Sequence, residues 1–181
     1  ASGRVYTLGA DKLPGGRGFG EPLTLIIDIE ATDPIVTAFV HKPGNRLLLG
    51  SSDGKGFIAE EKDLVASTKT GKQAMNPTAP AKLSVCRSVS GDSVAVVGDN
   101  RKLLIFPLDE LPVMARGKGV KLQAYKDGGM KDAKTFTLED GLTWPWGKDK
   151  TRTEKNLMGW QGKRGSAGRM VPNGFPKDGK F

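Results

Sequence analysis

Basic residues and glycines occur together in four short segments, which are the strongest candidates for a functional site. The segments are residues 15–20 with Arg17, 68–72 with Lys69 and Lys72, 115–119 with Arg116 and Lys118, and 162–169 with Lys163, Arg164 and Arg169. Lys and Arg side chains neutralise phosphates, and glycine lets backbone N–H groups approach them closely. These eight basic residues are therefore predicted to bind a polyanion, with duplex DNA as the first candidate. For one such segment alone, an ordinary turn with solvated charges is the commoner interpretation.

One of these segments also has the spacing of a nucleotide-binding turn. Gly16, Gly18 and Gly20 form a Gly-x-Gly-x-Gly pattern. A phosphate-binding turn of that kind needs a strand before it, a helix after it and a distal acidic residue. Here Pro22 leads into a strand-like run, and no Gly-Lys-Ser/Thr sequence is present. An enzyme that binds a nucleotide at this segment is therefore only a third, weak hypothesis.

Residues for catalysis or metal binding are scarce. The chain has one histidine, His41, and one cysteine, Cys86, so their spacing provides no metal-ligand set. Cys86 lies in an alternating apolar segment and is expected to be a buried small hydrophobe, and His41 is expected in a loop before Pro43. Tyr6 and Tyr125 lie in strand patterns without a catalytic neighbourhood. We therefore expect no enzymatic activity, cofactor or metal in this chain.

The charge balance supports the same class of partner. There are 28 Lys and Arg against 20 Asp and Glu, a net charge of +8 over 181 residues, which predicts attraction to a polyanion. The densest apolar run, residues 23–29, is far shorter than the ~20 residues that span a bilayer. No signal-peptide pattern precedes it, and a single cysteine fits a reducing compartment. We expect a cytoplasmic protein without a membrane span, and a piece of a longer chain, because it opens directly in strand-like sequence.

The sequence repeats with a period of about 47 residues. Residues 5–13, 56–64 and 103–111 align without gaps, each an apolar strand followed by a turn, charged residues and a leucine. A weaker copy ends at Leu157, so the repeats end near Leu13, Leu64, Leu111 and Leu157. One of the four basic segments follows each of these leucines. The basic segments should therefore occupy equivalent positions and form a stripe along one rim.

The elements between the turns are predicted to be short strands. Apolar runs, several alternating in period two, predict half-buried strands; they are residues 4–8, 23–29, 35–40, 46–49, 93–97, 103–106, 120–125 and 134–138. Asp53-Gly54 and Asp99-Asn100 predict hairpin tips that need positive φ. Residues 59–64 and 108–111 are expected to be one-turn helical connectors, and 146–154 an exposed loop.

A repeat of this length with about four strands is typical of a propeller blade. The predicted fold is all-β, a propeller-like pinwheel of about four-stranded antiparallel blades with three to four blades present. It forms one domain over residues 1–169. Residues 170–181, rich in Pro and Gly, are expected to be a flexible C-terminal tail.

Several segments together resemble the C-terminal domain of the family formed by gyrase A and the A-type subunit of topoisomerase IV. They are residues 3–8 and 13–23, 51–57 with 63–66, and 103–107 with 111–112 and 116–119. The resemblance implies a β-pinwheel whose basic rim binds and bends duplex DNA and steers DNA segments to a type IIA topoisomerase core. It also implies a bacterial, nucleoid-associated heterotetramer with the B-type subunit of topoisomerase IV and the rest of the A-type subunit. That enzyme uses ATP to decatenate and relax DNA, with the ATP, Mg²⁺ and catalytic residues outside this chain.

Gyrase A and topoisomerase IV differ by one motif within this family. The gyrase polypeptide carries a Gln-Arg-Arg-Gly-Gly-Arg-Gly box, whereas this sequence has only shorter segments such as residues 114–119. The resemblance therefore favours topoisomerase IV, with gyrase A as an alternative. The other alternative is a propeller-like scaffold whose basic surface binds an acidic protein.

Overall fold

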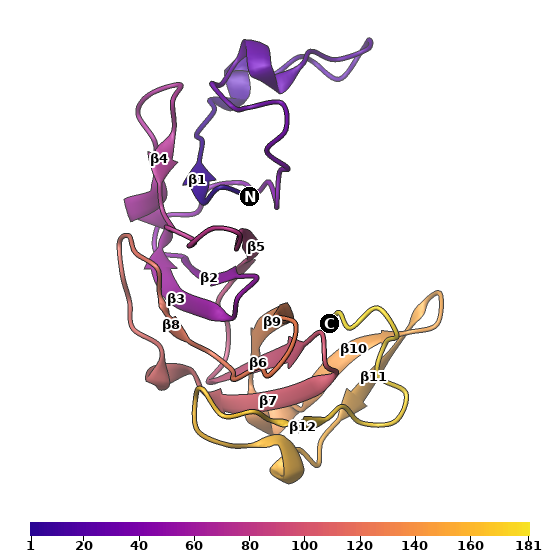
Figure 1. Ribbon diagram of the computed structural model, residues 1–181. Coiled ribbons are helices and arrows are strands. Elements are labelled where there is room, and N and C mark those ends of the chain that lie inside the picture. The colour runs from indigo at the N-terminus through magenta and orange to yellow at the C-terminus, as the bar shows by residue number, and fades with distance from the viewer.

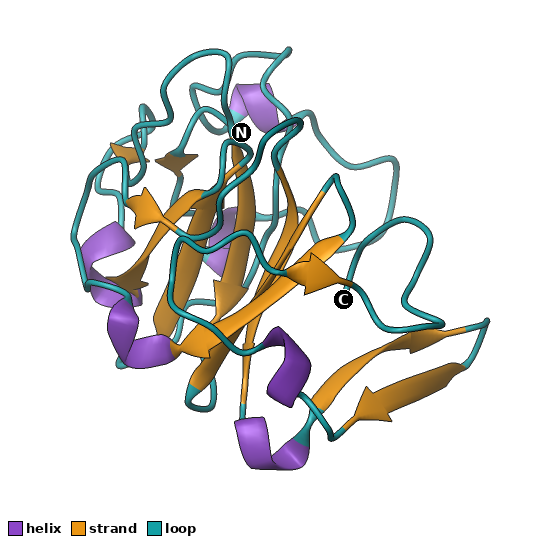
Figure 2. Ribbon diagram, turned by 60° about the horizontal axis from the view of Figure 1, so that its bottom comes forward, coloured by secondary structure: helices purple, strands orange, loops and turns teal.

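The computed structural model describes residues 1–181 and arranges the strands in four antiparallel sheets along an open arc (Figure 1). The strands are β1 (Arg4–Val5), β2 (Arg46–Ser51), β3 (Lys55–Glu60), β4 (Lys72–Gln73), β5 (Leu83–Ser88), β6 (Ser93–Gly98), β7 (Lys102–Pro107), β8 (Val120–Lys121), β9 (Met130–Phe136), β10 (Leu142–Trp146), β11 (Lys150–Glu154) and β12 (Arg169–Met170). The remaining regular elements are short 3₁₀ turns, η1 (Ala10–Lys12), η2 (Leu23–Leu25), η3 (Glu61–Leu64), η4 (Leu108–Glu110), η5 (Leu138–Asp140) and η6 (Met158–Trp160). Figure 2 shows these turns around the periphery of the strands. None of them is long and apolar enough to cross a membrane.

Two of the sheets are complete blades with the same topology. Their strand orders are β5-β2-β3-β8 and β9-β6-β7-β12, so each strand of one blade has its counterpart about 47 residues later in the other. The inner strands β5 and β9 lie toward the concave side of the arc, and β8 and β12 lie at its outer edge (Figure 1). The pairs β1-β4 and β10-β11 are partial blades at either end. The predicted all-β pinwheel is confirmed.

Each outer strand comes from the repeat that follows the blade it completes. After β2, β3 and η3, the chain crosses back to pair β4 with β1 of the preceding blade, and only then returns to place β5 beside β2. In the same way β8 follows β6 and β7 in sequence but pairs with β3, and β12 follows β10 and β11 but pairs with β7. Neighbouring blades are thus linked by exchanged strands as well as by packing.

The core is divided into three layers, each between two adjacent blades. In β2, Leu47 and Leu49 belong to one apolar cluster, whereas Leu48 belongs to the next. In β6, Val94 and Val96 likewise face the opposite way from the next residues along the strand. Every residue of β6 is buried. The predicted half-buried alternation is therefore wrong for these strands, because a blade covered on both faces requires apolar residues at consecutive positions.

Two predicted strands do not form in the N-terminal part. Residues 23–29 contain η2, whose hydrogen bonds are local, such as Leu25 N–H to the Pro22 carbonyl at 3.1 Å. Residues 35–40 form no strand either, and Ile35 and Val40 are 55 % and 81 % exposed. Apolar character alone does not create a strand where no neighbouring ladder satisfies the backbone groups. Conversely, the predicted loop 146–154 contains β11, paired with β10.

Both predicted hairpin tips place positive φ at the same position of the repeat, but only one of them has glycine there. In the β2–β3 hairpin it falls on Gly54, as expected, with φ of 83°. In the β6–β7 hairpin it falls on Arg101, with φ of 59°, rather than on Asp99 or Asn100. Arg101 is the repeat counterpart of Gly54. A positive φ strains the backbone of a non-glycine residue such as Arg101. The side chain of Arg101, which glycine would lack, bonds the C-terminal segment.

Arg101 holds the C-terminal segment, which packs against the last blades rather than extending away. Its guanidinium donates hydrogen bonds to the carbonyl groups of Phe175, Pro176 and Lys177 at 3.4, 3.0 and 3.2 Å. Phe175 is buried in the same cluster as Trp144, whose ring it meets edge to face. The structure thus differs from the expected tail at residues 170–181, because its two phenylalanines supply apolar surface that the last blade buries.

Candidate nucleic-acid interface

Three of the four basic segments occupy equivalent positions on the outer edge of the arc. They end at the outer strands β4, β8 and β12, each following the 3₁₀ turn of its repeat, η3, η4 or η6. Lys72 begins β4 and Arg169 begins β12. The fourth segment, residues 15–20, follows η1 in the same way but leads into η2 instead of an outer strand. The sequence predicts that the basic segments share one position in the repeat. In these three repeats that position is where the chain crosses from one blade to the preceding one.

A glycine precedes each outer strand for a steric reason. Gly119, with φ of 79°, lies so close to β3 that a Cβ atom would stand 2.6 Å from the Gly56 carbonyl oxygen. Gly71 before β4 and Gly168 before β12 meet the carbonyls of Val5 and Leu103 in the same way. These glycines are thus required by the approach of two strands. Their recurrence in the basic segments does not by itself indicate phosphate binding.

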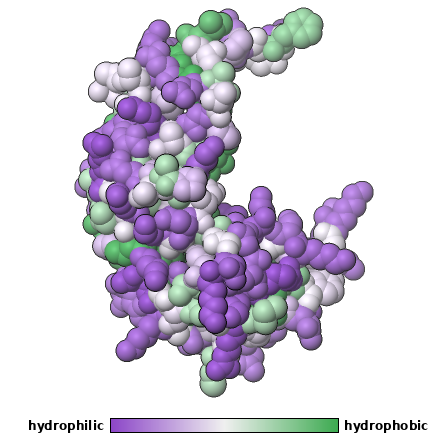
Figure 3. Space-filling view, in the orientation of Figure 1, coloured by the Kyte–Doolittle hydropathy of each residue, from purple (hydrophilic) through white to green (hydrophobic).

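Backbone hydrogen bonds join neighbouring basic segments into one band. The Asn76 N–H, just after β4, donates to the Gly117 carbonyl at 2.8 Å, and Gly117 N–H donates to Ala74. One blade further on, Gly165 N–H donates to the Leu122 carbonyl at 2.8 Å, just after β8. The basic residues are therefore held at fixed positions around the outer edge, which is largely hydrophilic in Figure 3.

The side chains of this band carry positive charge without acidic partners. Seven of the predicted residues are exposed: Arg17, Lys69, Lys72, Arg116, Lys118, Lys163 and Arg169. None of them, nor Arg164, belongs to a salt bridge, whereas Lys55 and Lys62 elsewhere pair with Asp53 and Glu60. Unpaired cations that lie along one edge give a surface of positive potential suited to a polyanion.

Arg164 differs from the other seven because its side chain is partly buried and already bonded. Its Nε donates to the Glu110 carbonyl at 2.9 Å and its Nη1 to the Lys121 carbonyl at 2.7 Å. The guanidinium therefore fixes the segment 162–168 against η4 and β8. Its charge still contributes to the edge, but its geometry is that of a positioning residue.

Sequence reasoning missed two basic residues beside the band, Arg4 and Lys12. Arg4 Nη1 donates to the Thr70 carbonyl at 2.6 Å and so holds the segment before β4. Lys12 lines a cavity of about 360 Å³ together with Lys69 and with Leu25 of η2. The two lysines come from different repeats, so only the fold brings them together. The β1–β4 pairing that does so is two residues long and leaves no pattern in the sequence.

The residue types that could act in catalysis, Cys86, Glu61 and His41, have environments that fit packing and loop anchoring. Burial raises the pKa of the Cys86 thiol to about 11, and the nearby Glu61 adds to the effect, so the thiolate is scarce at neutral pH. Glu61 is 2 % exposed and accepts hydrogen bonds from Lys42 N–H at 2.6 Å and Asn45 Nδ2 at 2.7 Å, with His41 Nδ1 at 2.7 Å. Burial alone raises the pKa of Glu61, but these hydrogen bonds outweigh it and hold the pKa below its ordinary value. His41 and Glu61 thus anchor the loop before β2.

Nothing in the fold supports a nucleotide site at residues 15–20. The regular element that follows them is η2, three residues long and 3₁₀ in type, so no α-helix N-terminus faces the glycines. No group of three or more His, Cys, Asp or Glu residues is placed to hold a metal ion.

Comparison with known proteins places this architecture in a known family. The family described as DNA gyrase C-terminal domain, beta-propeller, matches residues 45–84 and 92–130, which span most of the two complete blades. The A-type subunit of DNA topoisomerase 4 from Rickettsia bellii is 46 % identical over 181 residues, and that from Caulobacter vibrioides is 42 % identical over the same length. The chain belongs to the family of gyrase A and topoisomerase IV C-terminal domains. The match covers all of this chain but only 24 % of each of these relatives.

Solved structures of the family have the same fold. The E. coli ParC C-terminal domain superposes with a TM-score of 0.82 at 23 % identity, covering 95 % of this chain and 74 % of that one. A DNA gyrase A C-terminal domain gives a TM-score of 0.70 at 17 % identity, covering 99 % of this chain and 60 % of that one. The fold described here therefore persists at low sequence identity.

Proposed function

We propose that this chain is a non-catalytic module that binds and bends duplex DNA around its outer edge. The observation that carries the proposal is the band of basic segments before β4, β8 and β12, which is held by backbone hydrogen bonds and whose predicted Lys and Arg side chains belong to no salt bridge. Contacts to phosphates at successive blades would follow a curved path, so a bound duplex would bend. Such contacts carry no base-specific information and predict binding that does not depend on sequence.

In the whole protein, this module would deliver DNA segments to the catalytic part of a topoisomerase. The relatives at 42–46 % identity are A-type subunits of DNA topoisomerase 4, and the gyrase box is absent from this sequence, so topoisomerase IV is favoured over gyrase. We infer a type IIA enzyme that decatenates and relaxes DNA with ATP, in a heterotetramer with the B-type subunit. Mg²⁺, ATP and the cleavage tyrosine would then be bound or supplied elsewhere, and the whole would act at the bacterial nucleoid.

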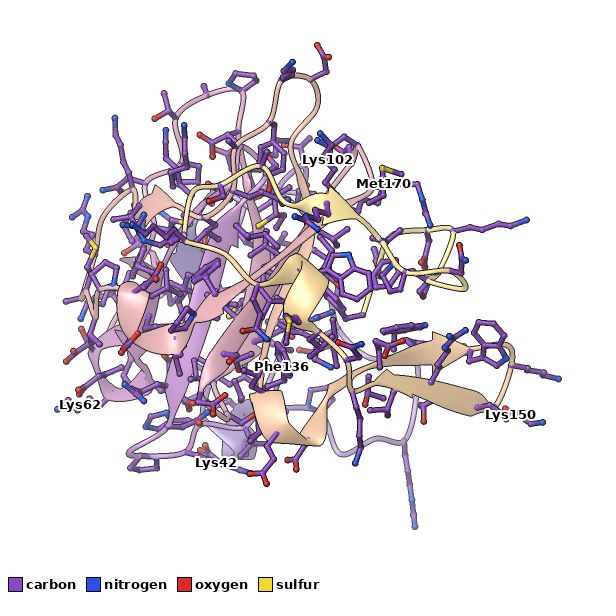
Figure 4. The ribbon with its side chains drawn as sticks, turned by 90° about the horizontal axis from the view of Figure 1, so that it is seen from below. Lys42, Lys62, Lys102, Phe136, Lys150 and Met170 are labelled. Atoms are coloured by element: carbon purple, nitrogen blue, oxygen red, sulfur yellow. The ribbon has the colours of Figure 1, made fainter.

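The decisive experiment compares two double variants of equal charge loss. Arg116→Ala with Lys118→Ala removes two cations from the band, whereas Lys62→Ala with Lys155→Ala removes two exposed lysines outside it. Figure 4 shows Lys62 well apart from Met170 of the outer strand β12. Affinity for duplex DNA is measured by fluorescence anisotropy at several salt concentrations. The slope of log affinity against log salt should fall by about two for the first variant, at about 0.9 per phosphate contact, and by much less for the second.

Two results would refute the proposal in different ways. Equal losses in both variants would mean that the net charge of +8 acts only as a general attraction. No binding to DNA, together with binding to an acidic protein, would favour the scaffold hypothesis. The chain itself should neither cleave DNA nor hydrolyse ATP; cleavage that disappears on Tyr6→Phe or Tyr125→Phe would contradict its non-catalytic role.

A further inference from the structure

One aromatic side chain stands free in solvent at the first basic segment. Phe19 is 112 % exposed relative to its reference state, more than any other large apolar residue of the chain. It lies in the loop between η1 and η2, which projects from the end of the arc at the upper right of Figure 1. A phenyl ring stabilises a fold mainly when its apolar surface is removed from water. A ring that is fully exposed therefore contributes nothing to the stability of the fold.

The backbone around Phe19 presents the ring rather than burying it. Gly18 and Gly20, on either side, have φ of 109° and 71°. No heavy atom lies within 4 Å of a Cβ atom built on either residue, so crowding does not require glycine there. The positive φ values instead give this loop a turn that ordinary residues rarely adopt. Its consequence is a Phe19 side chain held on a narrow tip.

One basic residue lies in this loop and another immediately precedes it. Arg17 lies two residues before Phe19 and is exposed, with Glu21 two residues after it as the acidic residue of the loop. Lys12, at the end of η1 just before the loop, and Lys69, from the next repeat, line one cavity together with Leu25 of η2, just after the loop. The ring therefore projects from a basic segment that the Lys12–Lys69 cavity joins to the band before β4, which distinguishes it from an isolated exposed hydrophobe elsewhere on the surface.

We propose that Phe19 inserts as a wedge between two stacked base pairs of the duplex bound to the outer edge. This inference rests on the proposed DNA-binding function. Apolar side chains inserted at a base step partly unstack it and kink the duplex, and Arg17, Lys12 and Lys69 would neutralise the flanking phosphates. Pyrimidine–purine steps such as TA unstack most easily. The module would accordingly bind and bend DNA best where such a step meets the end of the arc.

The test uses two duplexes, one with a central TA step and one with a stiff A-tract. Wild-type chain, Phe19→Ala, Phe19→Trp and Met158→Ala are compared. Met158 is a matched control, because it is 81 % exposed and lies in η6, beside another basic segment. Affinity is measured by anisotropy at several salt concentrations, and bending by energy transfer between dyes on the duplex ends.

Phe19→Ala should weaken binding to the TA duplex about tenfold, or ~1.4 kcal/mol, and remove both the bend at that step and the preference over the A-tract. Its salt slope should stay unchanged, because no phosphate contact is lost. Phe19→Trp should keep the bend, and Met158→Ala should behave as wild type. The melting temperature of Phe19→Ala should equal that of wild type, since the ring packs against nothing.

The outcomes separate the wedge from the proposed function. If wild type binds with a steep salt dependence but Phe19→Ala bends both duplexes equally well, the wedge is wrong and the DNA-binding edge stands. If wild type does not bind DNA, both proposals fail. If Phe19→Ala leaves DNA binding intact but weakens association with the remainder of the topoisomerase, the ring belongs to a protein contact and the wedge is also wrong.

Discussion

Replacement of Gly119 by alanine should destabilise the fold because two strands meet at this residue. The Cβ atom of alanine would stand 2.6–2.8 Å from the oxygen, carbonyl carbon and Cα of Gly56 in β3. All three are backbone atoms, so no side chain can rotate away to make room. Either β8 must move from β3 or the crossing segment must change its path.

The magnitude has two parts. Alanine at φ of 79° costs about 1–2 kcal/mol from its left-handed conformation. Forced displacement of packed atoms adds about 1–3 kcal/mol. The sum is about 3 kcal/mol, which for a chain of this size corresponds to a drop of roughly 6–12 °C in melting temperature.

Gly16 provides a control that isolates the steric part. Its φ is 74°, close to that of Gly119, but no heavy atom lies within 4 Å of a Cβ built there. Gly16→Ala should therefore cost only the conformational part, about 1–2 kcal/mol. Calorimetry and urea denaturation of both variants give the comparison. Equal losses of unfolding free energy would show that β8 does not approach β3 as closely as described, and would refute the steric explanation of the recurring glycine.

Three further predictions concern buried or strained groups. Glu61→Gln should lower the free energy of unfolding at neutral pH by about 2 kcal/mol, because an amide nitrogen replaces one accepting oxygen. In the native chain, the stabilisation from Glu61 is present above its ordinary pKa of 4.5 and is lost as pH falls through the lower folded pKa, so urea midpoints of the variant should fall less on acidification. Tyr125→Phe should change stability by less than about 0.5 kcal/mol, because its buried hydroxyl has no hydrogen-bond partner; a loss above about 1 kcal/mol in thermal denaturation would reveal a bound water. Arg101→Gly should relieve the positive φ but release residues 175–177, so hydrogen exchange there should accelerate while β6 and β7 stay protected; unchanged exchange would show that packing of Phe175 suffices.

The parts of the fold that sequence predicts well are local. The hairpins β2–β3 and β6–β7 are apolar runs joined by short turns, and each is followed by a 3₁₀ turn, η3 or η4. Strand pairing between neighbours in sequence needs only a turn and two apolar faces. The blade, the repeat length and the all-β class follow from these hairpins.

The parts that sequence does not predict depend on partners far along the chain. Strands β4 and β8 are two residues each and carry no apolar pattern of their own, because their hydrogen bonds are to strands of the preceding blade. Strand β11 is made of charged and threonine residues that bury little, so its sequence is typical of a loop. For the candidate site, the sequence predicts the basic segments and their common phase, but the Lys12–Lys69 cavity and the anchoring by Arg164 require the fold.

The exchange of outer strands means that the duplicated sequence unit and the cooperative structural unit do not coincide. Strand β8 belongs by sequence to the repeat of β6 and β7 but completes the sheet of β2 and β3. A deletion of that repeat of about 47 residues would therefore also remove the edge strand of the preceding blade. Whole blades can therefore be gained or lost only by cuts that follow the crossing segments. A force that pulls on one basic segment would also act on the strand-pairing hydrogen bonds of the preceding blade, because the segment continues into the outer strand of that blade. A bent polymer bound at several such segments would therefore strain neighbouring blades together.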